Sequence, residues 1–413
     1  MDIQISKAIL SGKVKIPASK SVSHRSIICA ALSNSKSVIK NISYSDDIVA
    51  TIDVMKSLGA EFELYDDYIV VKGIDGNFSK NNKSEISVGV KESGSTFRFL
   101  LPMLSMIGSE VCIKTEGKLI DRPLDVYYDV FKKNDIGYKI DGKNFIISKS
   151  TGIDSGRYSI KGNISSQFVS GLLFLLPLLK GDSILEIEGD LESKSYVDLT
   201  LDCLQKFCVK VDNIGYKKFA IKGNQRYIST DIDLEGDYSQ YAFFHIANEL
   251  GSKIEISGVD KNSLQGDKKV IEIVDNYKKD DNYSFDGCNV VDVVPIISLF
   301  ACINCKESRI YNISRLRMKE SDRIEAVCSV LRSLGADISA DESSIYIRGV
   351  NNLKGGVEVD SFGDHRIAMM TAIAGSICEN DIVLKNAEVV SKSYPDFWEV
   401  YSNLGGRIKT LVD

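Results

Sequence analysis

The sequence predicts an α/β protein built of six βαβαββ repeats, three in each of two domains. Four segments share one pattern, in which the end of an amphipathic helix is followed by a break, an alternating strand, a tight turn and a second strand. They are residues 54–73, 130–149, 203–223 and 330–349. Apolar helices open near His24, Ser95, Ser166, Ser239, Val293 and His365, at successive spacings of 71, 71, 73, 54 and 72 residues. Self-similarity at a nearly fixed period indicates supersecondary units that stack on one another.

Two further copies of the pattern are incomplete. A degraded copy lies near residues 271–285, and a truncated copy closes the chain at residues 400–411. Residues 3–16 are predicted to form a first strand without a complete repeat of its own, and the lysine- and asparagine-rich residues 79–84 a solvated turn.

The length of the chain sets the number of domains. A chain of 413 residues exceeds the size at which single hydrophobic cores stop growing, so six repeats divide into three and three. We expect residues 19–225 to hold repeats 1–3. Residues 1–18 and 226–413 are expected to hold repeats 4–6 with the N-terminal strand, and the active site to lie in the cleft between the domains.

Composition narrows the possible partners. Apolar residues make up 44% of the chain, charged residues 26%, and the net charge is -6. Because no basic face or tail is visible, nucleic acid is not expected as a partner. The longest apolar run, residues 168–179, is shorter than the roughly 20 residues that span a bilayer, and is typical of a buried helix. With an N-terminus unlike a signal peptide, these features predict a cytoplasmic protein without a membrane partner.

The nine cysteines are odd in number and scattered, which favours a reducing compartment over a disulfide framework. Cys302 and Cys305 form a C-x-x-C pair, but no second pair or nearby histidine accompanies it. Two small apolar residues at the end of a buried helix are therefore favoured over a zinc site. No metal is expected.

Cofactor-binding motifs are missing or broken. No G-x-G-x-x-G follows a strand, so dinucleotide binding is not supported. Residues 89–96 resemble a P-loop, but Ser95 stands where the phosphate-binding lysine would be. We therefore expect neither nucleotide chemistry nor another cofactor.

Polar residues collect where the apolar helices open. Serine, aspartate and glycine at these openings are good N-caps, so routine capping explains any one of them. The cations beside them are harder to explain, because a cation opposes the dipole at a helix N-terminus. They are Lys20, Arg25, Arg98 and Arg366. Cations beside free amides and hydroxyls predict a site for a phosphate or carboxylate.

The outer helices open on a second set of charged residues. Their starts fall at residues 45–47, 121–123, 193–196, 319–323 and 391–395, and Ser-Lys-Ser-Tyr occurs at both 193 and 391. Since equivalent joints of a repeated scaffold lie on one face, two opposed faces would gather many cations in one cleft. They are Lys20, Arg25, Arg98, Arg122, Lys319, Arg323, Arg366 and Lys392. A small ligand with more than one phosphate or carboxylate would offset their repulsion.

Two acids and a histidine lie among these cations. Asp292 sits between apolar stretches, so it is either a helix cap or a general base whose pKa is set by burial and by cations. Glu320 is either a proton-handling group or an ion-pair partner of its basic neighbours. His365 is either a hydrogen-bonded residue at a helix start or a catalytic group.

Eight motifs together resemble the 5-enolpyruvylshikimate-3-phosphate synthase family over essentially the full chain. They are PASKSVSHR (17–25), ESGSTFRFL (92–100), DRPLD (121–125), GNISSQFVSGLL (162–173), SKSYVDLT (193–200), RMKESDRIEA (317–326), FGDHRIAM (362–369) and SKSYPDFW (391–398). The resemblance implies the two-domain enolpyruvyl transferase fold, in which each domain is an inverse α/β barrel-like assembly of three repeats. It also implies that substrates bind between domains that close on them.

The resemblance implies transfer of the enolpyruvyl group of phosphoenolpyruvate to the 5-hydroxyl of shikimate 3-phosphate, with release of phosphate. By motif matching, the shikimate 3-phosphate site would contain Lys20, Ser21, Arg25, Ser165, Ser166, Gln167, Ser193, Asp292 and Lys319. The phosphoenolpyruvate site would contain Lys20, Gly94, Arg122, Gln167, Arg323, Arg366 and Lys392. Asp292 would take the hydroxyl proton, while Glu320 and Lys20 would move protons at the methylene carbon.

The chain departs from the family pattern at two places. Glu92 and Ser95 stand in an Asn-x-Gly-Thr motif, and Arg315 stands where a family asparagine meets the shikimate ring. Gly94 is retained, which predicts inhibition by glyphosate in competition with phosphoenolpyruvate. A chain that closes its own cleft needs no partner subunit, so a monomer is expected.

Two alternatives remain. UDP-N-acetylglucosamine enolpyruvyl transferases share the fold and the donor, but that family usually has Lys-Asn where this chain has Lys20-Ser21. It also carries a reactive cysteine before an Arg-Pro, and no cysteine precedes Arg122 in residues 117–121. A non-catalytic anion-binding scaffold is the other alternative, although Lys20, Asp292, Glu320 and Lys392 are all retained.

Overall fold

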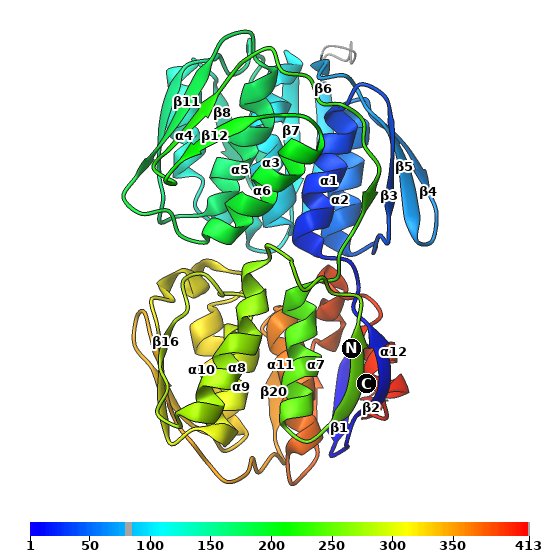
Figure 1. The fold of residues 1–413 in the computed structure, drawn as a ribbon, viewed down its shortest axis with the longest axis vertical. Coiled ribbons are helices and arrows are strands. Elements are labelled where there is room, and N and C mark those ends of the chain that lie inside the picture. Colours follow the sequence, from blue (N-terminus) through cyan, green and yellow to red (C-terminus); the bar gives the residue numbers. More distant parts are fainter. Residues whose placement is uncertain (79–84, 412–413) are drawn as a thin grey trace. The chain divides into compact units, whose positions relative to one another are not determined.

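The computed structural model describes residues 1–78 and 85–411. The chain forms two compact domains (Figure 1). Ala18–Glu235 form the continuous domain, and Met1–Pro17 with Gly236–Asp413 form the discontinuous domain. The predicted turn at residues 79–84 lies outside the described residues.

The continuous domain contains three four-stranded sheets of one design. In each sheet the first two strands are parallel, and an antiparallel hairpin follows on one side. The first sheet is β14 (Ile232–Asp233), β3 (Lys36–Lys40), β5 (Tyr68–Lys72) and β4 (Glu61–Leu64). The second is β6 (Glu85–Lys91), β7 (Glu110–Thr115), β9 (Asn144–Ile147) and β8 (Tyr138–Asp141). The third is β10 (Arg157–Lys161), β11 (Ser183–Glu188), β13 (Lys218–Ile221) and β12 (Val211–Ile214).

The helices of the continuous domain divide into inner and outer sets. The inner helices are α1 (Lys20–Leu32), α3 (Gly94–Leu104) and α5 (Ser166–Leu175). The outer helices are α2 (Asp46–Ser57), α4 (Asp125–Lys133) and α6 (Lys194–Lys206). Residues Phe168 to Leu175 of α5 are all buried, as predicted, but the predicted run of residues 168–179 continues beyond Leu175 as the 3-10 helix Leu176–Leu178, in which Leu178 is only partly buried. The outer helices instead bury one stripe against the inner layer.

The discontinuous domain also contains three sheets, but one of them has two strands instead of four. One sheet is β16 (Phe285–Asp286), β17 (Glu307–Tyr311), β19 (Ile345–Arg348) and β18 (Asp337–Ala340). Another is β20 (Glu358–Asp360), β21 (Ile382–Lys385), β1 (Asp2–Ser6) and β22 (Arg407–Leu411). The third has two parallel strands, β2 (Ser11–Lys15) and β15 (Lys253–Ser257).

The helices of the discontinuous domain also form two sets. The inner helices are α7 (Tyr238–Glu249), α9 (Val294–Asn304) and α11 (His365–Ile377). The outer helices are α8 (Val270–Lys279), α10 (Arg323–Ser333) and α12 (Phe397–Asn403). Helix α8 occupies most of the segment in which a degraded strand-turn-strand copy was expected, and that prediction is wrong. Residues 271–279 carry a helical apolar stripe of Ile273, Val274 and Tyr277.

Strands from distant parts of the chain complete three of the repeats. The prediction of one strand over residues 3–16 is wrong, because β1 and β2 belong to different sheets. Strand β1 lies between β21 and β22, so the blue N-terminal end lies beside the red C-terminal end (Figure 1). Residues 226–235 belong to the continuous domain, because Ile232 in β14 pairs with Ile39 in β3.

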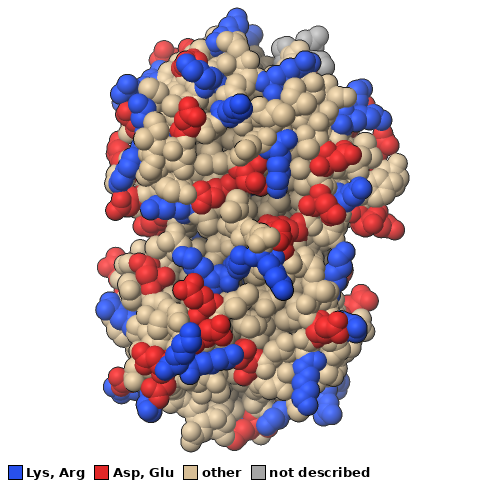
Figure 2. Space-filling model, viewed as in Figure 1, with Lys and Arg blue, Asp and Glu red and all other residues tan. Residues whose placement is uncertain are grey.

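Lys, Arg, Asp and Glu are interspersed over the visible surface of each domain (Figure 2). Across residues 1–78 and 85–411, no helix is long and apolar enough to cross a membrane.

Candidate active site

In the continuous domain, the start of helix α1 positions two predicted cations. The Lys20 ammonium lies 2.8 Å from the Asp47 carboxylate at the start of α2. Arg25, one turn further along α1, is fully buried and donates to the Thr200 hydroxyl at 2.8 Å and to the Tyr196 carbonyl at 2.8 Å. Arg25 also donates to the carbonyl of Ser21 at 2.6 Å. These bonds tie the start of α1 to the first turns of α6.

His24 is a buried, neutral residue of α1, next to Arg25. Burial lowers its pKa well below the ordinary value, and the neighbouring charges of Lys20 and Arg25 lower it further. A ring nitrogen of His24 lies 2.7 Å from the Thr51 hydroxyl, which lies 2.7 Å from the Thr96 hydroxyl. This hydrogen-bonded series connects the first turns of α1, α2 and α3.

Helices α3 and α5 bring a second group together. The Gln167 amide accepts a hydrogen bond from Arg98 at 2.8 Å and donates one to Ser95 at 3.0 Å. A methyl group at Gly94 would lie 3.3 Å from the Arg122 guanidinium, 3.5 Å from that of Arg98 and 3.8 Å from the Gln167 carbonyl. Gly94 therefore keeps a small space open beside two arginines and an amide, which suits a compact anion.

In the discontinuous domain, the buried Arg323 joins three carboxylates. Its guanidinium donates to Asp292 at 2.8 Å, to Glu320 at 2.8 Å and to Asp364 at 2.9 Å. Burial alone would lower the pKa of Arg323, but Asp364, Glu320 and Asp292 outweigh burial and raise it. The arginine therefore remains charged and fixes the positions of the two acids that were predicted to handle protons.

Asp292 has a second cation beside it. The Lys319 ammonium lies 3.5 Å from the same carboxylate oxygen that Arg323 contacts. Burial lowers the pKa of Lys319, and the charge of Asp292 opposes that shift. The N-cap of α9 is Val293, so the alternative that Asp292 caps this helix is wrong. Glu320 forms an ion pair with Arg323, and its role as a proton-handling group stays a prediction.

Arg366 is buried in the first turn of α11, and two nitrogen atoms of its guanidinium lack a hydrogen-bond partner among the described residues. Its Nε and Nη1 atoms make no hydrogen bond with any described residue. Burial lowers its pKa, but Asp292, Asp237 and Asp267 outweigh burial and raise it. Because buried polar atoms are nearly always hydrogen-bonded, the unpaired donors of Arg366 mark a place for an anion.

Asp267 is a buried carboxylate that was not among the predicted site residues. It accepts a hydrogen bond from the Ser239 hydroxyl. Burial raises its pKa to about 7, with Asp292 adding to the shift and Arg366 opposing it. The segment Leu-Gln-Gly-Asp, which ends at Asp267, carries no motif that marks this aspartate as buried beside the other charged residues.

The helix caps explain the remaining polar residues at four openings. Side chains of Ser93, Ser165, Asp237 and Asp364 accept hydrogen bonds from backbone amides in the first turns of α3, α5, α7 and α11. Ser166 is buried directly after its cap. Ser193 is the N-cap of α6 in a left-handed conformation, without a side-chain cap bond. His365 is buried in the first turn of α11.

Within each domain the structure brings most of the predicted residues into contact. Lys20, Ser21 and Arg25 share the start of α1, and Gly94, Arg122 and Gln167 meet beside Arg98. Asp292, Lys319, Glu320 and Arg323 form one network. Lys392 donates to the Gly363 carbonyl at 2.9 Å.

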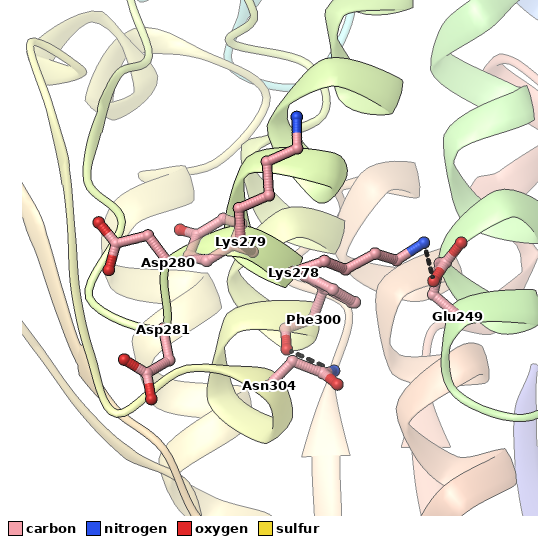
Figure 3. A pocket seen from close by; sticks show the side chains of 8 residues that line it. Glu249, Lys278, Lys279, Asp280, Asp281, Phe300 and Asn304 are labelled. Carbon is pink, nitrogen blue, oxygen red and sulfur yellow. Dashed lines mark hydrogen bonds and ion pairs between the residues drawn. The ribbon is translucent and has the colours of Figure 1, made fainter.

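A hollow of about 420 Å³ lies elsewhere in the discontinuous domain. It is lined by Glu249, Tyr277, Lys278, Lys279, Asp280, Asp281, Phe300 and Asn304 (Figure 3). Lys278 pairs with Glu249 at 2.8 Å, and Asp281 pairs with Lys306 at 2.6 Å. Charged neighbours therefore already neutralise much of its lining. None of the predicted site residues lines this hollow.

Comparison with known proteins shows the family to which this chain belongs. The family model of EPSP synthase (3-phosphoshikimate 1-carboxyvinyltransferase) matches residues 5–401. The chain belongs to the EPSP synthase family. A 3-phosphoshikimate 1-carboxyvinyltransferase of Clostridium kluyveri is 44% identical over 421 residues, which cover 98% of each chain. One from Clostridium botulinum is 45% identical over 414 residues, which cover 96% of each chain.

A solved EPSP synthase of Acinetobacter baumannii has the same fold. It superposes with a TM-score of 0.80 at 22% identity and covers 99% of each chain. The predicted α/β fold of enolpyruvyl transferases is therefore confirmed. The family assignment also disfavours the UDP-N-acetylglucosamine enolpyruvyl transferase alternative.

The two departures from the EPSP synthase pattern occupy defined places. Glu92 packs directly on Gly117, where an added methyl group would overlap the carboxylate. Gly117 has a φ of 54°, which also favours glycine. Arg315 lies in the 3-10 helix Ser314–Met318, among the charges that act on Lys319.

Proposed function

We propose that this chain transfers the enolpyruvyl group of phosphoenolpyruvate to the 5-hydroxyl of shikimate 3-phosphate and releases phosphate. Membership of the EPSP synthase family supports this activity. The observation that carries it is the network in which Arg323 holds Asp292 and Glu320. The network places two carboxylates beside cations in a buried setting, which suits proton transfer beside an anionic substrate.

In the proposed reaction, the 5-hydroxyl oxygen attacks C2 of phosphoenolpyruvate while Asp292 takes the hydroxyl proton. The methylene carbon gains a proton and becomes a methyl group, which gives a tetrahedral intermediate. That methyl group then loses a proton as the C–O bond to phosphate breaks, which restores the enol double bond. Glu320 and Lys20 are proposed to supply and remove the proton at this carbon.

The shikimate 3-phosphate site is proposed to contain residues of both domains. Its members are Lys20, Ser21, Arg25, Ser165, Ser166, Gln167, Ser193, Asp292 and Lys319. Support comes from the hydrogen bonds of Arg25, which join the starts of α1 and α6. Hydroxyls and amides at helix starts suit a phosphate monoester.

The phosphoenolpyruvate site is proposed to contain Lys20, Gly94, Arg122, Gln167, Arg323, Arg366 and Lys392. Support comes from the unpaired donors of Arg366 and from the open space at Gly94. A planar guanidinium matches both the phosphate and the carboxylate of this substrate. Both substrates are polyanions, so their binding offsets the repulsion among these cations.

The choice of acceptor tests the proposed function directly. Purified protein is supplied with phosphoenolpyruvate and either shikimate 3-phosphate or UDP-N-acetylglucosamine, and phosphate release is measured. We expect release only with shikimate 3-phosphate. Release only with the sugar nucleotide would move the chain to the cell-wall enzymes. Tight binding of shikimate 3-phosphate without release would favour the non-catalytic scaffold.

Glyphosate is expected to inhibit in competition with phosphoenolpyruvate, and Gly94→Ala is expected to weaken that inhibition. The added methyl group would lie 3.3 Å from Arg122, closer than ordinary contact, so a bound anion would be crowded. We expect the glyphosate Ki to rise at least tenfold, about 1.4 kcal/mol. Initial rates at several phosphoenolpyruvate concentrations give Ki and KM. An unchanged Ki, or inhibition independent of phosphoenolpyruvate, would contradict this placement of Gly94.

We also propose that the active form is a cytoplasmic monomer. All nine cysteines are free thiols, which suits a reducing compartment. The one chain contains every residue of both proposed sites. Light scattering is expected to give 45.6 kDa, and a value twice as large would overturn the proposal.

A further inference from the structure

The two identical Ser-Lys-Ser-Tyr segments differ in how their third residue is held. In the first copy, the Ser195 hydroxyl is buried without a hydrogen-bond partner. In the second copy, the Ser393 hydroxyl accepts a hydrogen bond from the side-chain amide of Gln240 at 3.1 Å. Within the described residues, the hydroxyl of the third residue is thus bonded to a distant side chain in the second copy only.

Gln240 reaches Ser393 from the first turn of α7, across 153 residues of sequence. Both side chains are buried, with Gln240 1% and Ser393 7% exposed. Asp237 caps the same turn and fixes the backbone amides of Ser239 and Gln240. A buried amide on a capped helix start is a rigid anchor, because its rotamer and backbone are both constrained.

The anchored segment carries Lys392. Its ammonium donates to the Gly363 carbonyl at 2.9 Å, and Gly363 directly precedes Asp364. Asp364 in turn caps α11 and accepts two hydrogen bonds from Arg323. A chain of contacts therefore runs from α7 through residues 392–393 and 363–364 to the Arg323 network.

We propose that Gln240 is a positioning residue for Lys392, acting through the hydroxyl of Ser393. A lysine side chain is long and loses much rotamer freedom when it is fixed, so its usefulness depends on a well-placed backbone. The Gln240 bond holds the side chain of Ser393, the residue next to Lys392, and so limits how far that part of the chain can shift. This inference rests on the proposed function, in which Lys392 binds phosphoenolpyruvate.

The test compares Gln240→Met, Ser393→Ala and their double variant with Lys392→Gln as the reference. Methionine keeps the length and unbranched shape of glutamine and removes the amide. We expect KM for phosphoenolpyruvate to rise about three- to tenfold in both single variants, in line with one lost hydrogen bond. KM for shikimate 3-phosphate is expected to stay within twofold, and the double variant to match Ser393→Ala.

Ser195→Ala is the matched control, because it removes the equivalent hydroxyl from the copy in which that hydroxyl has no hydrogen-bond partner in the described part of the chain. Both KM values are expected to stay unchanged in this variant. If Lys392→Gln raises KM for phosphoenolpyruvate while Gln240→Met and Ser393→Ala do not, the role of Gln240 is refuted and the proposed function stands. An unchanged KM in Lys392→Gln would refute the placement of Lys392 in the proposed function.

A purely structural role of Gln240 would give a different pattern. In that case both KM values would rise together, or the two single variants would add in the double variant, and either result would overturn the proposal. Gln240→Met could lower the midpoint of thermal unfolding, which would complicate its kinetics. In that case Ser393→Ala, which removes the same hydrogen bond from its other partner, decides the proposal. The deciding quantity is its change in KM for phosphoenolpyruvate relative to its change in KM for shikimate 3-phosphate.

Discussion

Replacing Asp292 with asparagine is expected to reduce kcat by about 10²–10⁴-fold, the usual contribution of a general base. Asparagine keeps the shape of the side chain and an oxygen for Arg323, which contacts Asp292 at 2.8 Å. It cannot accept the proton of the attacking hydroxyl. KM for shikimate 3-phosphate is expected to change less than kcat, because the hydrogen-bonding oxygen remains. Initial rates of phosphate release across both substrate concentrations separate the two effects.

Asp286→Asn is the control for this experiment. Asp286 lies six residues earlier in the same domain and is exposed, with hydrogen bonds to Cys288 and Asn312. Turnover in this variant is expected to match that of the unaltered chain. Nearly normal kcat in Asp292→Asn would exclude Asp292 as the base and direct attention to Glu320.

Replacing Arg323 with methionine is expected to destabilise the discontinuous domain by about 3–5 kcal/mol, as when one partner of a buried ion pair is removed. Three carboxylates lose their shared cation, and the side chain that is removed is only 1% exposed. Urea unfolding can be followed through Trp398, the single tryptophan of the chain. It lies in α12 of the discontinuous domain and therefore reports on this domain.

Arg317→Met provides the comparison for Arg323→Met. Arg317 also pairs with a carboxylate, Asp322 at 2.6 Å, but both side chains are partly exposed, at 30% and 41%. Exposed pairs contribute about 0–1 kcal/mol, so a small shift of the urea midpoint is expected. If the urea midpoint shifts equally in Arg317→Met and Arg323→Met, the buried ion pairs of Arg323 contribute no more than an exposed pair. Solvation by water would then account for the stability of the three carboxylates.

Much of the fold follows from local patterns in the sequence. The helix openings near Ser95, Ser166, Ser239, Val293 and His365 lie within one residue of the observed starts of α3, α5, α7, α9 and α11. Alternating strands and tight turns also mark the hairpins, because period-2 burial and turn residues are local signals.

The pairing of distant strands did not follow from the sequence. Residues 3–16 contain alternating apolar positions on both sides of Ile9, which is exposed, so one strand was expected there. The two halves separate because β1 pairs with β21 and β22, whereas β2 pairs with β15. Such choices depend on partners hundreds of residues away, for which one sequence holds no local signal.

The sequence predicted which residues belong to the candidate site, but not which of them form ion pairs with one another. Cations at helix starts indicated an anion site, and the structure places several of them together in each domain. These cations were expected to repel one another, yet Arg323 is neutralised by Asp292, Glu320 and Asp364. Asp364 looked like a routine cap, and it caps α11 as well as binding Arg323. One sequence does not show that a side chain has two roles.

The position of β1 has a consequence for synthesis on the ribosome. Asp2 pairs with Leu411, so the sheet that contains β1 cannot close until residue 411 has been synthesised. The continuous domain ends at Glu235 and can begin to fold while the rest is still being translated, since domains generally fold as units. The discontinuous domain carries the most non-local pairing in the molecule, and non-local pairing slows folding. Its assembly therefore depends on residues 407–411 being present and intact.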